Sequence, residues 1–353
     1  MLLGVVKSSP VNQRIVSLFL TLLLFVVSLA VIAVAGSYLT RTADKLADLS
    51  GWGEALFGAV FLGSITSLPG IITSVTTAYA NHPQLAVSNA IGGIAAQTMF
   101  LAIADMAYRK ANLEHASASL ENLMQGVLLL GLLSTILIGV NGPAISLFHI
   151  SPFSLLLLLM YAGGFRLISR AQNQPMWKPL ITTHTVKDEP EKETLKNSSL
   201  PRMALRFGVL AVLVAVSGYG VAQAGIGLVE QTTLSEGFVG NVLTAVATST
   251  PELVVSVAAI RQRALNLAVS NIIGGNTFDV LFVAFADMAY LEGSILQAVG
   301  QAQTFTIALT MLMTSVLILG LLVREKHGIA RIGWESVLIV LLYLLGNLFV
   351  YFA

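Results

Sequence analysis

The chain has 353 residues, of which 56% are hydrophobic and only 10% are charged, and its net charge is +1. A soluble domain needs more polar surface than this composition supplies, so an ordinary soluble protein is excluded. No basic stretch is interleaved with aromatic residues, so we expect no nucleic-acid partner, and the absence of cysteine excludes disulfides and thiolate metal sites.

Apolar segments long enough to cross a bilayer, which takes about 20 residues, recur along the whole chain. The first is longer than the apolar core of a typical signal peptide, and we interpret it as a retained span. We predict an all-α polytopic membrane protein with ten transmembrane helices. They cover 15–36, 54–80, 84–108, 122–140, 144–169, 203–228, 235–260, 265–290, 301–323 and 332–352.

The longest polar segment, 170–201, joins the fifth and sixth predicted helices. It contains several prolines and a dense run of charges at 187–193, a composition typical of a solvated linker. We therefore divide the chain into a first five-helix half, 1–169, the linker, 170–201, and a second five-helix half, 202–353.

Lysine and arginine are concentrated on one predicted side of the membrane. Of the 19 in the chain, 17 lie in the linker, at its edges or in the connections that follow odd-numbered helices, and only Lys7 and Arg14 lie on the other side. The positive-inside rule then places the linker in the cytoplasm and both termini outside. We expect a multi-pass protein of the cell membrane whose partners are the lipid bilayer and inorganic cations.

Two segments, 63–108 and 245–290, repeat each other at a shift of 182 residues, with 20 identities in 46 positions and no gap. The shift places Pro69 on Pro251. Because each half has an odd number of predicted helices, the two alpha-repeats, about 54–108 and 236–290, have opposite orientations. Inverted repeats with interrupted helices are typical of secondary transporters, which bind their substrate where the repeats meet, near the midplane.

Glu252 and Asp279 are carboxylates in the middle of predicted spans. A carboxylate at this depth is costly unless it is paired, protonated or holding a cation. Pro251 also leaves the carbonyl four residues earlier without its helix hydrogen bond, so the turn at Thr248 and Ser249 offers carbonyl and hydroxyl oxygens. Since hard cations such as Ca²⁺ prefer oxygen ligands, the pattern indicates a cation site.

Other polar residues of the repeats carry weaker predictions. Asp105 and Asp287 lie near helix ends, where we expect a structural or gating role. Glu54 and Glu236 fall at helix starts, where a carboxylate caps the positive end of the helix dipole. Polar neighbours of the carboxylates are Ser270, Asn271, Asn276 and Thr277.

These residues resemble the calcium/cation antiporter superfamily, and the sodium/calcium exchangers in particular. That family carries G-T-S-x-P-E and then, on the next helix, G-N-x-x-G-S-N-x-x-N/D. The second repeat reads A-T-S-T-P-E, ending at Glu252, and S-N-I-I-G-G-N-T-F-D, ending at Asp279. The resemblance implies an exchanger-like fold, no cofactor, no enzymatic activity and transported Ca²⁺ and Na⁺. It implies the ligands Glu252, Asp279, Thr248, Ser249, Thr66, Ser67, Gln97 and Asn276.

The first repeat departs from the family pattern. Gly70 stands where the family has glutamate, Gln97 where it has Asn or Asp, and Ile94 where it has asparagine. Gly93 and Gly275 replace serines that help to bind sodium in the family. Fewer anionic ligands lower the affinity for a dehydrated divalent ion.

Several functions therefore stay open. The protein is expected to exchange calcium for sodium, or to move magnesium, a monovalent ion or a proton-coupled cation. A transport-inactive ion-binding protein is a further alternative, against which the retained Glu252 and Asp279 argue. An intramembrane enzyme is disfavoured, because no histidine lies in the middle of a predicted span.

Overall fold

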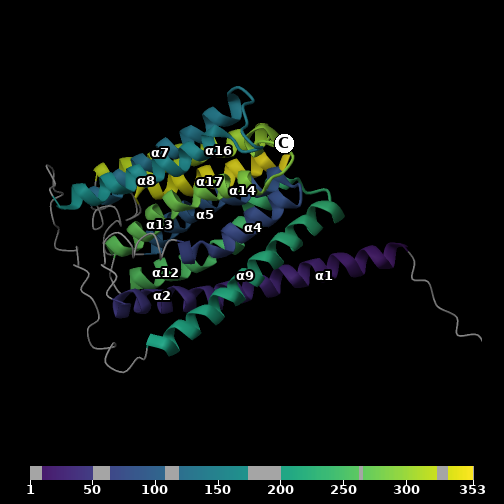
Figure 1. The fold of residues 1–353 in the computed structure, drawn as a ribbon, viewed down its shortest axis with the longest axis horizontal. Coiled ribbons are helices and arrows are strands. Elements are labelled where there is room, and N and C mark those ends of the chain that lie inside the picture. Colours follow the sequence, from purple (N-terminus) through teal and green to yellow (C-terminus); the bar gives the residue numbers. More distant parts are fainter. Residues whose placement is uncertain are drawn as a thin grey trace, which may run out of the picture.

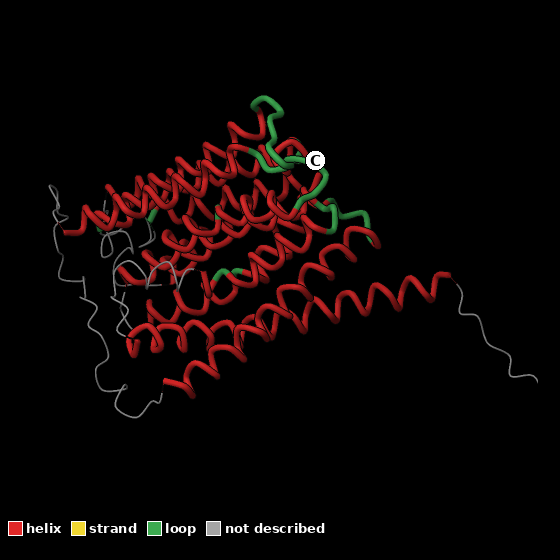
Figure 2. The backbone as a smooth tube through the Cα atoms, viewed as in Figure 1, coloured by secondary structure: helices red, strands yellow, loops and turns green. Residues whose placement is uncertain are grey.

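The computed structural model describes residues 10–50, 64–107, 119–173, 200–261, 265–323 and 333–352. Within these ranges every regular element is a helix, apart from one isolated bridge between Leu147 and Ile150. The start of α1 and the C-terminus lie at one end of the bundle, and the ends of α8 and α9 that flank 174–199 lie at the other (Figure 1). Most described loops lie at the end that holds the C-terminus (Figure 2).

In the first half, α1 continues through a π-helical segment, η1, directly into α2. The elements are α1 (Pro10–Val31), η1 (Ile32–Gly36), α2 (Ser37–Ser50), α4 (Leu68–Tyr79), α5 (Pro83–Ala107), α7 (Leu120–Asn141) and α8 (Pro152–Asn173).

In the second half, two predicted spans are each built from several consecutive helices. The elements are α9 (Leu200–Gln231), α10 (Glu236–Phe238), η3 (Val239–Thr244), α11 (Ala245–Thr248), α12 (Thr250–Arg261), α13 (Leu265–Asp279), α14 (Leu281–Ala289), α15 (Ile295–Ala298), α16 (Gln301–Val323) and α17 (Trp334–Phe352).

Eight helices among the described residues are long and apolar enough to cross a membrane, or nine if the bent pair Glu236–Thr248 and Thr250–Arg261 is one span. The described residues therefore do not confirm the predicted number of ten. The difference falls on the predicted helix 54–80, because 51–63 lies outside the described residues and α4 has only 12 residues. The predicted linker lies mostly outside the described residues, and α8 and α9 extend into its two edges.

The predicted start of the fifth helix, at 144, is wrong by about two turns. Residues 142–151 form a loop instead, in which Phe148 and His149 have φ angles of 50° and 66°, and α8 begins at Pro152. Left-handed backbone interrupts a helix, and proline is well suited to the first helical position, because its missing N–H has no helical partner there.

The centre of the bundle is formed by α5 and by α13 with α14. Of their most apolar windows, 89% and 78% of residues are buried, against 11% for Ile15–Ala43. Gly92 of α5 makes part of this packing possible, because a Cβ atom there would lie 2.5 Å from Cα of Asn241 in η3. Small residues let helix backbones approach closely in membrane proteins.

Both helices that carry the repeated prolines break just before them. Ser67 (φ −83°, ψ 0°) precedes α4, and Ser249 (φ −90°, ψ 5°) separates α11 from α12 with a bend of 50°. The breaks follow from Pro69 and Pro251, which have no N–H to donate to the preceding turn. The prediction of a loosened turn at 247–249 is confirmed.

Two aspartates that occupy the same position in the two repeats, Asp105 and Asp287, connect the two halves of the chain. Asp287 of α14 accepts hydrogen bonds from Ser154 Oγ (2.6 Å), Ser151 N (2.7 Å) and Ile295 N (2.7 Å). Asp105 of α5 accepts one from Ser336 Oγ in α17 (2.8 Å). Ser154 and Ser336 are themselves 182 positions apart, so the two repeats make the same contact with the opposite half. The contacts support the expected structural role.

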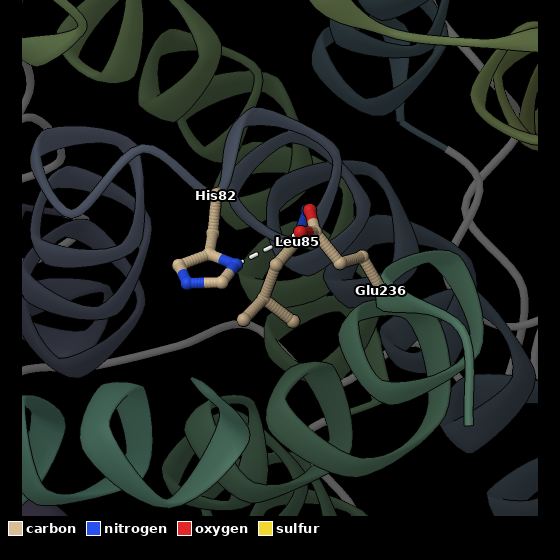
Figure 3. A network of polar contacts seen from close by, with 3 residues as sticks. All are labelled: His82, Leu85 and Glu236. Carbon is tan, nitrogen blue, oxygen red and sulfur yellow. Dashed lines mark hydrogen bonds and ion pairs between the residues drawn. The ribbon is translucent and has the colours of Figure 1, made fainter. Parts of the chain in front are cut away.

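Glu236 caps a helix, although not the one predicted. Ser235 caps α10 by accepting a hydrogen bond from Phe238 N (3.2 Å), whereas the Glu236 carboxylate accepts one from Leu85 N, in the first turn of α5 (2.9 Å). Its other oxygen pairs with His82 Nδ1 at 2.8 Å (Figure 3). This cluster joins the turn between α4 and α5 to the start of α10. Glu54 lies outside the described residues.

Candidate cation site

The eight residues proposed as ligands lie at the two breaks and on the two central helices that face them. None of them exposes more than 6% of its surface, so their polar groups are held away from bulk water. They are Thr66 and Ser67 at the first break, Gln97 on α5, Thr248, Ser249 and Glu252 at the second break, and Asn276 and Asp279 at the end of α13.

Asp279 is the centre of a hydrogen-bond network that joins the two repeats. Its Oδ1 accepts a hydrogen bond from Ser67 Oγ (2.5 Å), and its Oδ2 accepts one from Gln97 Nε2 (2.6 Å). The same Gln97 nitrogen donates to Ser249 Oγ (3.3 Å). Hydrogen bonds to an ionised carboxylate are among the strongest in proteins, so this network orients Asp279 well.

Gln97 also carries an oxygen without a partner. Its Oε1 is buried and accepts no hydrogen bond from the described residues. A buried amide oxygen of this kind costs free energy unless something satisfies it, and amide oxygens are ligands that hard cations accept.

Glu252 lies in the first turn of α12, directly after the second break, and is only 1% exposed. Its side chain is hydrogen-bonded by Thr66 from the first break and lies close enough to Asp279 for the two carboxylates to interact electrostatically. Its Oε2 has no hydrogen-bond partner in the described part of the chain. A buried carboxylate oxygen beside a second carboxylate and without a donor is what a cation would satisfy.

Thr248 and Asn276 lie beside this network rather than in it. The Thr248 hydroxyl donates mainly to the backbone of its own helix, at Thr244 O (3.0 Å), with a longer contact to Asn89 Oδ1 (3.5 Å). Asn276 Nδ2 donates to Thr98 Oγ1 (3.0 Å), which leaves its buried Oδ1 without a partner among the described residues.

Two polar residues that the sequence did not single out as ligands support the site. Asn89 donates to Gly70 O (3.3 Å) and to Ser74 Oγ (2.9 Å), next to the first break. Its identical repeat partner, Asn271, makes the matching contact with Ser256 (3.3 Å). The internal repeat could therefore have indicated a role for Asn89. Thr98, which accepts the hydrogen bond from Asn276, aligns with an apolar residue in the other repeat, so the repeat does not indicate a role for it.

The two glycines that replace the family's serines face the network. A Cβ atom at Gly93 would lie 3.3 Å from Ser249 Oγ, and one at Gly275 would lie 3.5 Å from Gln97 Oε1. A serine at Gly93 would therefore lie next to Ser249, and a serine at Gly275 would lie next to Gln97. Ser270 and Asn271 make other contacts: Ser270 bonds Asn122 (2.8 Å), and Asn271 bonds Ser256.

The site therefore offers two carboxylates together with hydroxyl and amide oxygens. No group of three or more His, Cys, Asp or Glu side chains that could hold a metal ion occurs among the described residues. An all-oxygen set of this kind suits hard cations better than transition metals, which favour imidazole and thiolate ligands.

The sequence and fold match known proteins over most of the chain. The family described as sodium/calcium exchanger protein matches residues 20–166 and 203–352. The inner membrane protein YrbG of Escherichia coli (strain K12) is 26% identical over 272 residues, which cover 74% of this chain and 77% of YrbG. The protein named "Putative antiporter CaxA", of Alkalimonas amylolytica, is 25% identical over 300 residues, covering 84% of this chain and 88% of CaxA.

A solved structure has the same fold. The sodium-calcium exchanger NCX_Mj, soaked with 10 mM Na⁺ and zero Ca²⁺, superimposes with a TM-score of 0.58 at 19% identity, covering 93% of this chain and 98% of that one. Proteins of this family are membrane transporters rather than enzymes, and they act on transported ions without a cofactor. With the family matched over both halves, the chain belongs to the sodium/calcium exchanger family and to the wider group of calcium/cation antiporters.

Proposed function

We propose that this protein is a secondary active antiporter that exchanges Na⁺ for Ca²⁺ across the cell membrane. Glu252 and Asp279 would be its central ligands. The observation that carries the proposal is the buried Glu252 Oε2, which has no hydrogen-bond donor among the described residues and belongs to a carboxylate that interacts electrostatically with Asp279. Membership of a family of cation antiporters supports it.

The hydroxyls and amides of the network would complete the coordination. Ser67 and Gln97 already contact Asp279, and Thr66 contacts Glu252, so a cation between the carboxylates would meet oxygens from both repeats. Because both Asp279 oxygens accept hydrogen bonds, an arriving cation would compete with the Gln97 amide.

Transport would proceed by alternating access. We take 1–169 and 202–353 as two inverted five-helix halves, with the linker in the cytoplasm and both termini outside, as the lysine and arginine distribution favours. Rocking or sliding of part of each half, with the two breaks framing the site, would open it to one side at a time. The contacting partners would be inorganic cations and the lipid bilayer.

A second candidate function follows from Gly70. Without a carboxylate at this position, the proposed ligand set carries only Glu252 and Asp279, which favours a less strongly charged cargo, such as a monovalent ion, or coupling to protons through Glu252. Magnesium is a further candidate. Each of these would use the same residues in the same antiport scheme.

The first experiment is Ca²⁺ uptake into proteoliposomes that are loaded with Na⁺ and diluted into Na⁺-free buffer. We expect uptake that requires the Na⁺ gradient and that is lost in Glu252→Gln, which keeps the shape of the side chain and removes its charge. Glu230→Gln, an exposed carboxylate near the end of α9, is the matched control and should transport normally.

The same vesicles separate the candidate functions. Ca²⁺ uptake driven by a proton gradient, or Mg²⁺, Na⁺ or K⁺ flux without Ca²⁺ flux, would replace Na⁺/Ca²⁺ exchange with the second candidate. The absence of flux of any of these ions through correctly inserted protein would contradict antiport altogether. Normal Ca²⁺ exchange in Glu252→Gln would exclude Glu252 as a central ligand.

A further inference from the structure

Gly70 and Glu252 occupy the same place in the two repeats, but the space in front of Gly70 is filled. A Cβ atom at Gly70 would lie 2.5 Å from Cε2 of Phe282, 3.2 Å from its Cζ and 3.4 Å from its Cδ2. A real Cβ atom does not come this close to an aromatic carbon. The ring of Phe282, at the start of α14, therefore takes the room that any side chain at position 70 would need.

Two further aromatic rings hold the Phe282 ring in this place. Phe282 is only 4% exposed, and it packs edge to face on Phe278, with ring centroids 6.3 Å apart and an interplanar angle of 78°. Phe278 in turn packs edge to face on Tyr161 of α8, at 5.9 Å and 74°. Because protein interiors are close-packed, the Phe282 ring cannot withdraw from Gly70 without disturbing this row of rings.

The backbone at Gly70 nevertheless stays within the polar part of the break. Its carbonyl oxygen accepts a hydrogen bond from Asn89 (3.3 Å), and Ser67, three residues earlier, donates to Asp279. The first break thus supplies hydroxyls and carbonyls, whereas the space that a side chain at position 70, the repeat equivalent of Glu252, would need is filled by the apolar ring of Phe282.

We propose that Phe282 is a specificity-determining residue of the cation site. By filling the space in front of Gly70, it makes the charge of the site one-sided, because both carboxylates, Glu252 and Asp279, come from the second repeat. This arrangement weakens the hold on divalent cations. The inference rests on the proposed function of the same site.

The test is a set of variants that exchange the ring for a carboxylate. Gly70→Glu, Phe282→Ala and the double variant are purified in detergent, and their melting temperatures and Ca²⁺ affinities are measured, the latter by titration calorimetry. Gly70→Glu alone should melt well below the wild type because of the clash. In the double variant, stability should recover and Ca²⁺ should bind about tenfold or more tighter than in Phe282→Ala, since a third carboxylate joins the site.

Two further variants keep the test decisive. Phe100→Ala removes the ring that stands at the position of Phe282 in the other repeat, and combining it with Gly70→Glu should not restore stability. Phe282→Glu places a carboxylate in the same space from α14, and it should raise Ca²⁺ affinity even if the double variant does not fold.

A double variant that folds but binds Ca²⁺ no tighter than Phe282→Ala would overturn the inference, as would Gly70→Glu with wild-type stability. Transport by the wild type, measured separately, keeps the two proposals apart. If the wild type exchanges no cation while the double variant gains Ca²⁺ binding, the proposed function fails and Phe282 keeps its role. The opposite pair of results would retain the function and reject the role of Phe282.

Discussion

The Gln97 side chain donates a hydrogen bond of 2.6 Å to Asp279, the residue 182 positions later that occupies the same place in the other repeat. The hydroxyls on either side follow the same relation, because Ser67 donates to Asp279 and Ser249 accepts from Gln97. The two repeats thus meet at a pair of equivalent positions. The pair is symmetric in place and asymmetric in charge, since one side is an amide and the other a carboxylate.

The first prediction concerns this pair. Gln97→Leu removes the donor to one oxygen of a buried carboxylate, and leaving such a group without its partner costs about 1–3 kcal/mol of stability. We also expect Na⁺ or Ca²⁺ to raise the melting temperature less in Gln97→Leu than in the wild type, because leucine offers no oxygen in place of the Gln97 Oε1 that would ligate the cation.

Gln303→Leu is the matched control for this variant. Gln303 is equally buried, but its amide donates to Ser88 Oγ (3.1 Å), a neutral partner. This variant should lose stability without any change in its response to cations. Equal cation-induced shifts in both variants and the wild type, measured by thermal unfolding in detergent, would contradict a cation site at Asp279.

The sequence predicted a site where the two repeats meet. The residues of the second repeat indicate Ser249 and Asp279, the resemblance to the exchangers adds Ser67 and Gln97, and the structure joins the four in one hydrogen-bond network. Thr98 could not be found in this way, since its contact with Asn276 has no counterpart in the other repeat. A pairing argument finds only what both copies share.

Packing between segments that are distant in the sequence could not be predicted from it. The contact of Phe282 with Gly70 joins residues on α14 and α4, and no pattern along either helix predicts it. The loop at 142–151 could not be predicted for a different reason. Its apolar residues favour a helix, and the hydropathy of Phe148 and His149 does not indicate that their backbone is left-handed. Hydropathy identifies segments that avoid water but does not determine their backbone.

The second prediction concerns Asp287, which accepts hydrogen bonds from two backbone N–H groups and from Ser154. Asp287→Ala leaves all three donors without this partner, and we expect it to cost about 3 kcal/mol or more, at roughly 1–3 kcal/mol for each buried donor that stays unsatisfied. Ser154→Ala removes one donor together with its bond and should cost about 1 kcal/mol.

Chemical unfolding of both single variants and of the double variant checks this prediction. In the double variant the loss should be smaller than the sum of the single losses, because the Ser154 hydroxyl has no role once Asp287 is gone. Strict additivity would show that the hydrogen bond between them contributes nothing to the join between α14 and α8.

The third prediction concerns the glycines that lie against the two breaks. A Cβ atom at Gly218 of α9 would lie 2.9 Å from the carbonyl oxygen of Pro69, and one at Gly36 of η1 would lie 2.6 Å from Cγ of Pro251. Gly36 and Gly218 are 182 positions apart, as are the two prolines. The first long helix of each half therefore packs closely on the break of the opposite half.

Gly218→Ala should consequently disturb the break at Pro69, because the atom it would meet belongs to the backbone and cannot rotate away. Thr73, whose hydroxyl donates to both Pro69 O (2.8 Å) and Gly218 O (2.9 Å), holds α4 and α9 together at this point. We expect a loss of about 1–3 kcal/mol in stability from overpacking and a lower rate of exchange in proteoliposomes.

Gly208→Ala on the same helix is the control. Nothing lies within 4 Å of a Cβ atom at Gly208, and alanine is favoured over glycine in a helix by about 1 kcal/mol, so this variant should be as stable as the wild type or more so, with unchanged transport. If both alanine variants behave alike, the close approach of α9 to Pro69 does not govern the break. If Gly218→Ala loses transport at full stability, the contact serves the movement of the break rather than its folding.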